Sequence, residues 1–293
     1  MKKCISSVDR DLSSMCATHE EADTRIILHG ADAAANGYDR LVIACRDTDV
    51  LLLLVVFSEY LAQEIWMRIG STKKPSFVNI KQIVLPPNTK EGLLAFHAVT
   101  GCDSTSQFSG IGKKSAWKTF VKHPSLLYDI GTTSIPSTST LKSAEAFVCK
   151  LYDPETEKVG IHDVRCSTFR KAKSNLDNLP PTQDSLMLHL KRAHYQTLVW
   201  KQSLVAQPEL PSPLESGWHL VETEMKPVLM TKNAISPNYI DIVSCQCKEN
   251  GGQCRNRHCA CVKGSMACTA SCRCGGKDWC KNTHNALDDS DSE

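Results

Sequence analysis

The feature that most constrains this chain is a cysteine-rich run near its carboxyl end. Nine of the fifteen cysteines fall in the pattern C-x-C-x6-C-x4-C-x-C-x6-C-x3-C-x-C-x5-C, and six are scattered over the first 166 residues. The nine are Cys245, Cys247, Cys254, Cys259, Cys261, Cys268, Cys272, Cys274 and Cys280. Structural zinc takes four thiolates, so three separate sites would need twelve. If three sulfurs each bridge two metals, nine suffice, and the count favours a cluster of three Zn²⁺ ions.

Two other interpretations of the cysteines stay open. A disulfide knot would leave one of the nine cysteines unpaired, and the chain carries no recognisable secretion signal. A metallothionein-like metal store is the second. The regular pattern and the interspersed Arg and Trp279 favour a folded module instead.

Residues 244–282 resemble the tesmin-type CXC domain, which is similar in cysteine pattern to the pre-SET cluster of histone methyltransferases. The tesmin type implies DNA binding, whereas the pre-SET type implies a mainly structural role. Seven Lys and Arg against two acidic residues, combined with nine thiolates and three Zn²⁺, leave a module charge near +2, which is modest for a DNA partner. The basic candidates for DNA contact are Arg255, Arg257, Lys263 and Arg273.

Acidic side chains form three clusters in the first half of the chain. Their members are Glu21 and Asp23 in HEEADTRI, Asp47 and Asp49 in RDTD after the predicted strand RLVIA, and Asp103 in GCDSTS. Strand ends of open α/β sheets are where ligands usually bind, so we expect these carboxylates to converge there. Converging carboxylates need a neutralising partner, and hard oxygen ligands select Mg²⁺ or Mn²⁺.

Each cluster also has an ordinary structural explanation. Acidic residues at the start of a helix are favoured by the helix dipole, which accounts for Glu21 and Asp23. Asp47 or Asp49 can simply cap the helix that follows. His19, His29 and His97 lie near the clusters, but lone histidines on helices are usually packing or surface residues, and we assign them no role.

The order EEAD, then VIACRDTD, then GCDSTSQFSGIGKKSAWKTF resembles the internal region of flap endonucleases and XPG-type nucleases, members of the PIN-like fold. The resemblance covers residues 17–122. It implies catalytic, metal-binding roles for Glu21, Asp23, Asp47, Asp49 and Asp103. It also implies a glycine hairpin that binds DNA phosphates through Gly110, Gly112, Lys113 and Lys114.

One departure from that family leaves two functions open. The family's fold begins with a strand that carries a further acidic residue, and Asp9 and Asp11 stand in a polar, Ser-rich stretch instead. With a complete site, the chain is a Mg²⁺- or Mn²⁺-dependent structure-selective nuclease. Without one, it is a non-catalytic DNA or chromatin adaptor that keeps the hairpin and the zinc cluster.

The patterns predict an α/β chain: a partial PIN-like three-layer domain over residues 1–130, with buried RLVIA as one strand. A helical extension follows over 131–203, then a proline-rich linker or wrapping arm over 204–240, the CXC module over 244–282 and an acidic tail over 283–293. The longest apolar run, at 50–57, is far below the roughly 20 residues of a membrane span. We therefore expect a soluble intracellular protein, placed in the nucleus by the family resemblance.

Overall fold

The computed structural model describes residues 11–171, 178–232, 244–264, 266–269, 272–275 and 277–286. Asp9, part of the predicted linker (233–240) and most of the predicted acidic tail (287–293) lie outside these residues. The chain forms two compact units, each built from segments far apart in sequence. The first unit comprises Met1–Gln107, Lys113–Phe147 and Met187–Val228, and the second comprises Phe108–Gly112, Val148–Leu186 and Leu229–Glu293.

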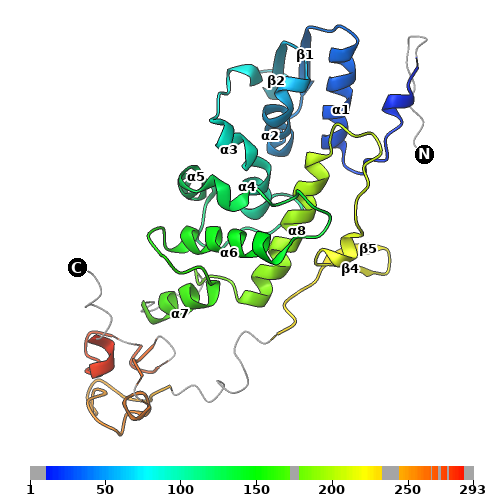
Figure 1. The fold of residues 1–293 in the computed structure, drawn as a ribbon. Coiled ribbons are helices and arrows are strands. Elements are labelled where there is room, and N and C mark those ends of the chain that lie inside the picture. Colours follow the sequence, from blue (N-terminus) through cyan, green and yellow to red (C-terminus); the bar gives the residue numbers. More distant parts are fainter. Residues whose placement is uncertain are drawn as a thin grey trace. The chain divides into compact units, whose positions relative to one another are not determined.

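The first unit opens with alternating helices and strands (Figure 1). Strand β1 pairs with β2 in parallel, and β2 pairs with β3 in antiparallel fashion, so the sheet order is β1-β2-β3. Helix α1 packs against α2. The elements are α1 (Ala22–Ala35), β1 (Arg40–Ala44), α2 (Thr48–Phe57), β2 (Glu64–Gly70) and β3 (Pro75–Asn79).

The burial predicted for RLVIA is wrong. Residues of β1 alternate between exposed and half-buried, and the Val42 side chain is 55% exposed. The reason is position: among the described residues β1 is an edge strand that pairs with β2 alone. Helix α2 carries the burial instead, because its run TDVLLLLVVF places Leu53 and Leu54 in the core.

Aromatic side chains build the core between the next helices. Phe96 stacks on Phe120 with ring centroids 4.6 Å apart, and Phe147 meets both rings edge-on. Helix α4 is buried along its whole length, so it lies at the centre of the unit. The helices are α3 (Pro87–Glu91), α4 (Leu93–Val99), α5 (Lys113–Lys122), α6 (Thr138–Tyr152) and α8 (Gln183–Lys201).

The proline-rich segment after α8 is more ordered than its sequence predicts. It contains an antiparallel hairpin of β4 (Trp218–Val221) and β5 (Glu224–Pro227). Arg192 of α8 fixes the hairpin by donating to the carbonyl of Gly217 at 3.2 Å. The arm is therefore tied to the first unit as far as this hairpin.

The second unit contains α7 (Ile161–Lys171) and the cysteine-rich segment, in which the described helices are short: α9 (Ala260–Lys263) and a 3₁₀ turn over Thr283–Ala286. In coarse terms the chain is a mixture of helices and small sheets with a cysteine cluster near its carboxyl end. Within the described residues, no helix combines the length and apolar character needed to cross a bilayer.

Candidate metal centres

Helix starts position four of the five predicted carboxylates. Glu21 is the N-cap of α1, and Asp23 lies in its first turn. Asp47 is the N-cap of α2, where its Oδ1 accepts a hydrogen bond from the Asp49 amide at 2.9 Å. Asp103 lies exposed in a tight turn closed by reciprocal backbone hydrogen bonds between Cys102 and Thr105.

These carboxylates lie close enough to influence one another's pKa values. Burial raises the pKa of Asp23, and the nearby charges of Asp47, Asp49 and Asp103 raise it further. Burial likewise raises the pKa of Glu21 against an opposing hydrogen bond from Gln196, with Asp23 and Asp49 adding to the rise. Among the described residues, no Lys or Arg forms an ion pair with Asp23, Asp47 or Asp103. The structure therefore gathers several acidic side chains near one another in the first unit, although no three of their ligand atoms in the described residues lie within 4.8 Å of one another.

A side chain of helix α8 hydrogen-bonds to Glu21. The Gln196 amide donates to both carboxylate oxygens of Glu21, at 2.9 and 3.2 Å. The Gln196 carbonyl accepts from the Ser104 hydroxyl at 2.6 Å, next to Asp103 in the chain. Gln196 is buried, so this contact also ties the start of α1 to the turn that carries Asp103.

A second buried contact holds Asp49. His97 of α4 lies with Nε2 2.7 Å from Asp49 Oδ1, and both residues are buried. Trp200, one helical turn after Gln196 on α8, stacks on the His97 ring at 5.8 Å. Lys113 Nζ lies 2.9 Å from His97 Nδ1 on the other side of the ring.

Lys113 keeps much of its surface exposed, but its ammonium group is enclosed. Nζ also contacts the His97 carbonyl at 3.0 Å and the Thr100 hydroxyl at 2.9 Å. This burial lowers the pKa of Lys113 to about 8, although the Cys102 and Asp49 charges oppose the shift. The predicted phosphate ligand Lys113 thus directs its amine toward its own unit, whereas Lys114 is exposed.

The segment predicted as a glycine hairpin contains a turn, closed by a hydrogen bond from the Ile111 amide to the Phe108 carbonyl, and belongs to the second unit. Gly110 has φ +74°, a left-handed conformation that favours glycine, and a Cβ there would lie 2.9 Å from the Asn178 side chain. Gly112 has open space around its Cα instead. Both glycines are exposed.

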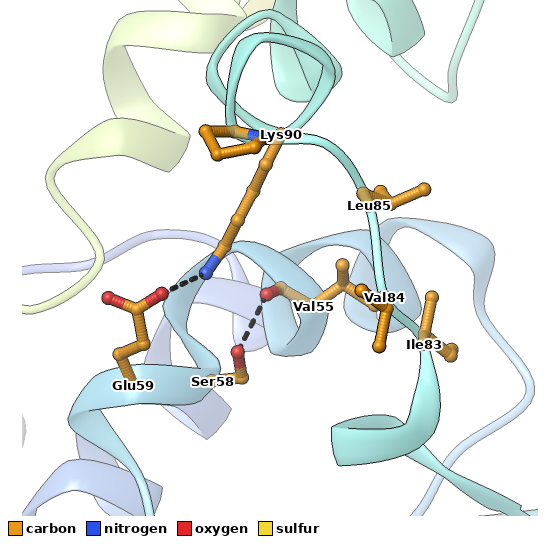
Figure 2. A pocket seen from close by; sticks show the side chains of 8 residues that line it. Val55, Ser58, Glu59, Ile83, Val84, Leu85 and Lys90 are labelled. Atoms are coloured by element: carbon orange, nitrogen blue, oxygen red, sulfur yellow. Dashed lines mark hydrogen bonds and ion pairs between the residues drawn. The ribbon is translucent and has the colours of Figure 1, made fainter.

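Two cavities open in the first unit. One of about 470 Å³ is lined by Leu52, Phe96, Trp117 and the His97 and Lys113 side chains. The other, of about 260 Å³, lies at the end of α2, where Lys90 pairs with Glu59 at 2.8 Å across from an apolar wall that includes Val84 (Figure 2). The five predicted carboxylates do not line this second cavity.

The nine predicted cysteine ligands form one packed cluster in the second unit. Seven are buried, and Cys247 and Cys280 are partly buried against them. Three overlapping groups of four have sulfurs close enough to share a metal ion. The groups are Cys245, Cys259, Cys261 and Cys268; Cys245, Cys254, Cys268 and Cys274; and Cys245, Cys247, Cys254 and Cys259. Cys272 and Cys280 stand outside these groups, and the Cys272 sulfur lies 3.4 Å from that of Cys261.

The spacing of the sulfurs fits zinc. Zn–S bonds of about 2.3 Å at tetrahedral angles place two sulfurs about 3.8 Å apart. The Cys245 sulfur lies 3.7 Å from Cys254, 3.9 Å from Cys268 and 3.6 Å from Cys274. All cysteines in the described part of the chain are free thiols, so these contacts are not disulfides.

The pKa values of the thiols in the cluster are shifted in different directions. Burial alone would raise the pKa of Cys259, but the Val262 and Cys261 amides and neighbouring sulfurs lower it to about 7. Burial raises the pKa of Cys268, against an opposing hydrogen bond from Asn282. Asn285 donates to the Cys280 sulfur at 3.3 Å. The residues that hydrogen-bond to the cluster therefore include Asn285, which lies in the segment predicted as an acidic tail.

Comparison with protein-family models, with curated proteins and with solved structures finds no match for this chain.

Proposed function

We propose that this chain binds DNA and is related to metal-dependent structure-selective nucleases, with Glu21, Asp23, Asp47, Asp49 and Asp103 as its hydrolytic site. The observation that carries the proposal is that Gln196 bonds to both Glu21 and Ser104, the neighbour of Asp103; the charges of Asp47, Asp49 and Asp103, which raise the pKa of Asp23, agree with it. Carboxylates that repel one another are chemically suited to divalent ions. A PIN-like ancestry agrees with the position of Asp47 and Asp49, which lie at the start of the helix that follows β1.

We assign a different role to each group of side chains around the proposed site. Held by these carboxylates, Mg²⁺ or Mn²⁺ would supply an activated water and stabilise the leaving oxygen of a phosphodiester. Gln196 orients Glu21, and His97 orients Asp49, through the hydrogen bonds described above. For phosphate contact we retain Gly110, Gly112 and exposed Lys114, since backbone amides and lysines bind phosphates without regard to sequence.

The cysteine cluster is proposed to hold three Zn²⁺ ions as a structural CXC module. The sulfur spacing supports zinc as the metal, and the proposed number of three ions rests on nine cysteines that share bridging sulfurs. The exposed basic residues Arg255, Arg257, Lys263 and Arg273 are its candidates for DNA contact. Nuclear localisation and chromatin partners belong to the same proposal.

Cleavage of branched and single-stranded DNA in Mg²⁺ or Mn²⁺ tests the hydrolytic site. We expect the wild-type chain to cut, and Asp47→Ala with Asp49→Ala to lose about 100-fold or more in rate, as when an electrostatic catalytic group is removed. Equal cleavage by both proteins would remove these residues from the mechanism. Binding without cleavage by the wild type would instead support the DNA or chromatin adaptor.

A further inference from the structure

The hydrogen-bond arrangement around Lys113 fixes where the His97 proton lies. A lysine ammonium has three N–H donors and no acceptor. Its three neighbours are His97 Nδ1, the His97 carbonyl and the Thr100 hydroxyl, at 2.9, 3.0 and 2.9 Å. The Thr100 hydroxyl already donates to the Phe96 carbonyl at 2.7 Å, so toward Lys113 it accepts.

Three donors therefore meet three acceptors, and His97 Nδ1 carries no hydrogen. The ring proton must then be on Nε2, which lies 2.7 Å from Asp49 Oδ1 and donates to it. A histidine with the opposite tautomer would present a lone pair to the Asp49 carboxylate. Lys113 thus determines that Asp49 receives a hydrogen bond at this oxygen.

We propose that Lys113 and His97 are positioning residues that hold the Asp49 carboxylate in the orientation needed for a divalent cation; this rests on the proposed function. Trp200 stacks on the ring and limits its tilt, and Lys113 lies 5.8 Å from the centre of the Phe96 ring. Three helices, α4, α5 and α8, thereby fix one side chain of α2.

Buried partners of this kind usually alter metal affinity by about 10- to 100-fold when removed. Lys113→Met keeps the length of the side chain but removes all three donors. Lys118→Met removes the same charge from the same helix at an exposed position, and so serves as the matched control. His97→Gln keeps a side-chain N–H donor that does not depend on Lys113.

Two measurements on the full chain test the proposal. Long-range ¹H–¹⁵N spectra without added divalent cation should show His97 with a protonated Nε2 and a bare Nδ1, and Lys113→Met should shift that Nδ1 signal. Mn²⁺ titration, followed by the electron paramagnetic resonance of the free ion, should show affinity about 10-fold weaker in Lys113→Met and unchanged in Lys118→Met. In the His97→Gln background, Lys113→Met should add little further loss.

A proton on Nδ1 in the wild type, or ring signals that ignore Lys113→Met, would overturn the proposal. So would equal Mn²⁺ affinity in Lys113→Met and the wild type. Absence of Mn²⁺ binding in every protein would refute the proposed hydrolytic site, and the ring spectra would then decide whether Lys113 sets the tautomer. The two failures are thereby distinguishable.

Discussion

Substitution of Cys245 should empty the zinc cluster far more completely than substitution of its near neighbour Cys247. Cys245 belongs to all three groups of four sulfurs, whereas Cys247 belongs to one. Cys245→Ser therefore leaves every group with three thiolates, and Cys247→Ser leaves only one group so depleted. We expect the wild-type chain to bind about three zinc ions. Cys245→Ser should bind fewer than about one, and Cys247→Ser should bind about two.

The energetic consequence follows from what fills the core of this module. Its buried apolar cluster consists of cysteines, with Val262 and Trp279 packed at its edge. Binding of one structural zinc contributes about 10 to 16 kcal/mol in small zinc modules, so the metal supplies most of the folding free energy. Cys245→Ser should unfold the module, whereas Cys247→Ser should leave it weakened but folded.

Zinc per chain is measured by elemental analysis after dialysis, and native mass spectrometry resolves the individual species. Cys166→Ser on α7 serves as a control, because its sulfur lies outside the three groups. Equal zinc loss in Cys245→Ser and Cys247→Ser would refute the shared role of Cys245. A wild-type content of one zinc or less would refute the proposed stoichiometry.

Two further predictions concern the carboxylates and the hairpin. The raised pKa values of Asp23 and Glu21 mean that their contribution to stability is complete below the ordinary carboxylate range and is lost as pH rises through the raised values. Asp23→Asn should therefore raise the melting temperature more at pH 7 than at pH 4, and added Mg²⁺ should shrink that gain by stabilising the wild type; a gain equal at both pH values would argue against repulsion. Gly110→Ala should lower the free energy of unfolding of its unit by about 1 kcal/mol because φ is +74° there, whereas Gly112→Ala should cost less. Denaturant unfolding of the two variants checks this, and equal losses would contradict the argument from backbone conformation.

Local sequence patterns predicted much of the secondary structure because its causes are local. The predicted helical extension over 131–203 contains the helices α6, α7 and α8. RLVIA was placed correctly but its burial was not, because composition does not show whether a strand has one neighbour or two. The β4–β5 hairpin was missed since prolines on both sides conceal a four-residue strand.

The contacts around the candidate sites could not be predicted in the same way. His97 lies 48 residues from Asp49, and a histidine within an apolar helix is indistinguishable in sequence from a packing residue. Gln196 carries no local signal of its contact with Glu21, although its spacing of four from Trp200 places both on one face of α8. The cysteine ligands could be predicted because their regular spacing in the sequence is a known signature of metal binding. The hydrogen bonds from Asn282 and Asn285 to the cluster could not, because these residues follow no motif.

The contact between Gln196 and Glu21 spans 175 residues of chain. Ribosomal synthesis runs from the amino end, so all five acidic groups leave the ribosome well before the helix that holds Glu21. Until α8 is made, Glu21 lacks its Gln196 partner, and joining segments so distant in the chain carries a loop-closure cost. We therefore expect the acidic side chains to assemble late, after α8 has been synthesised. Divalent cations would reduce the repulsion among these side chains most before that point.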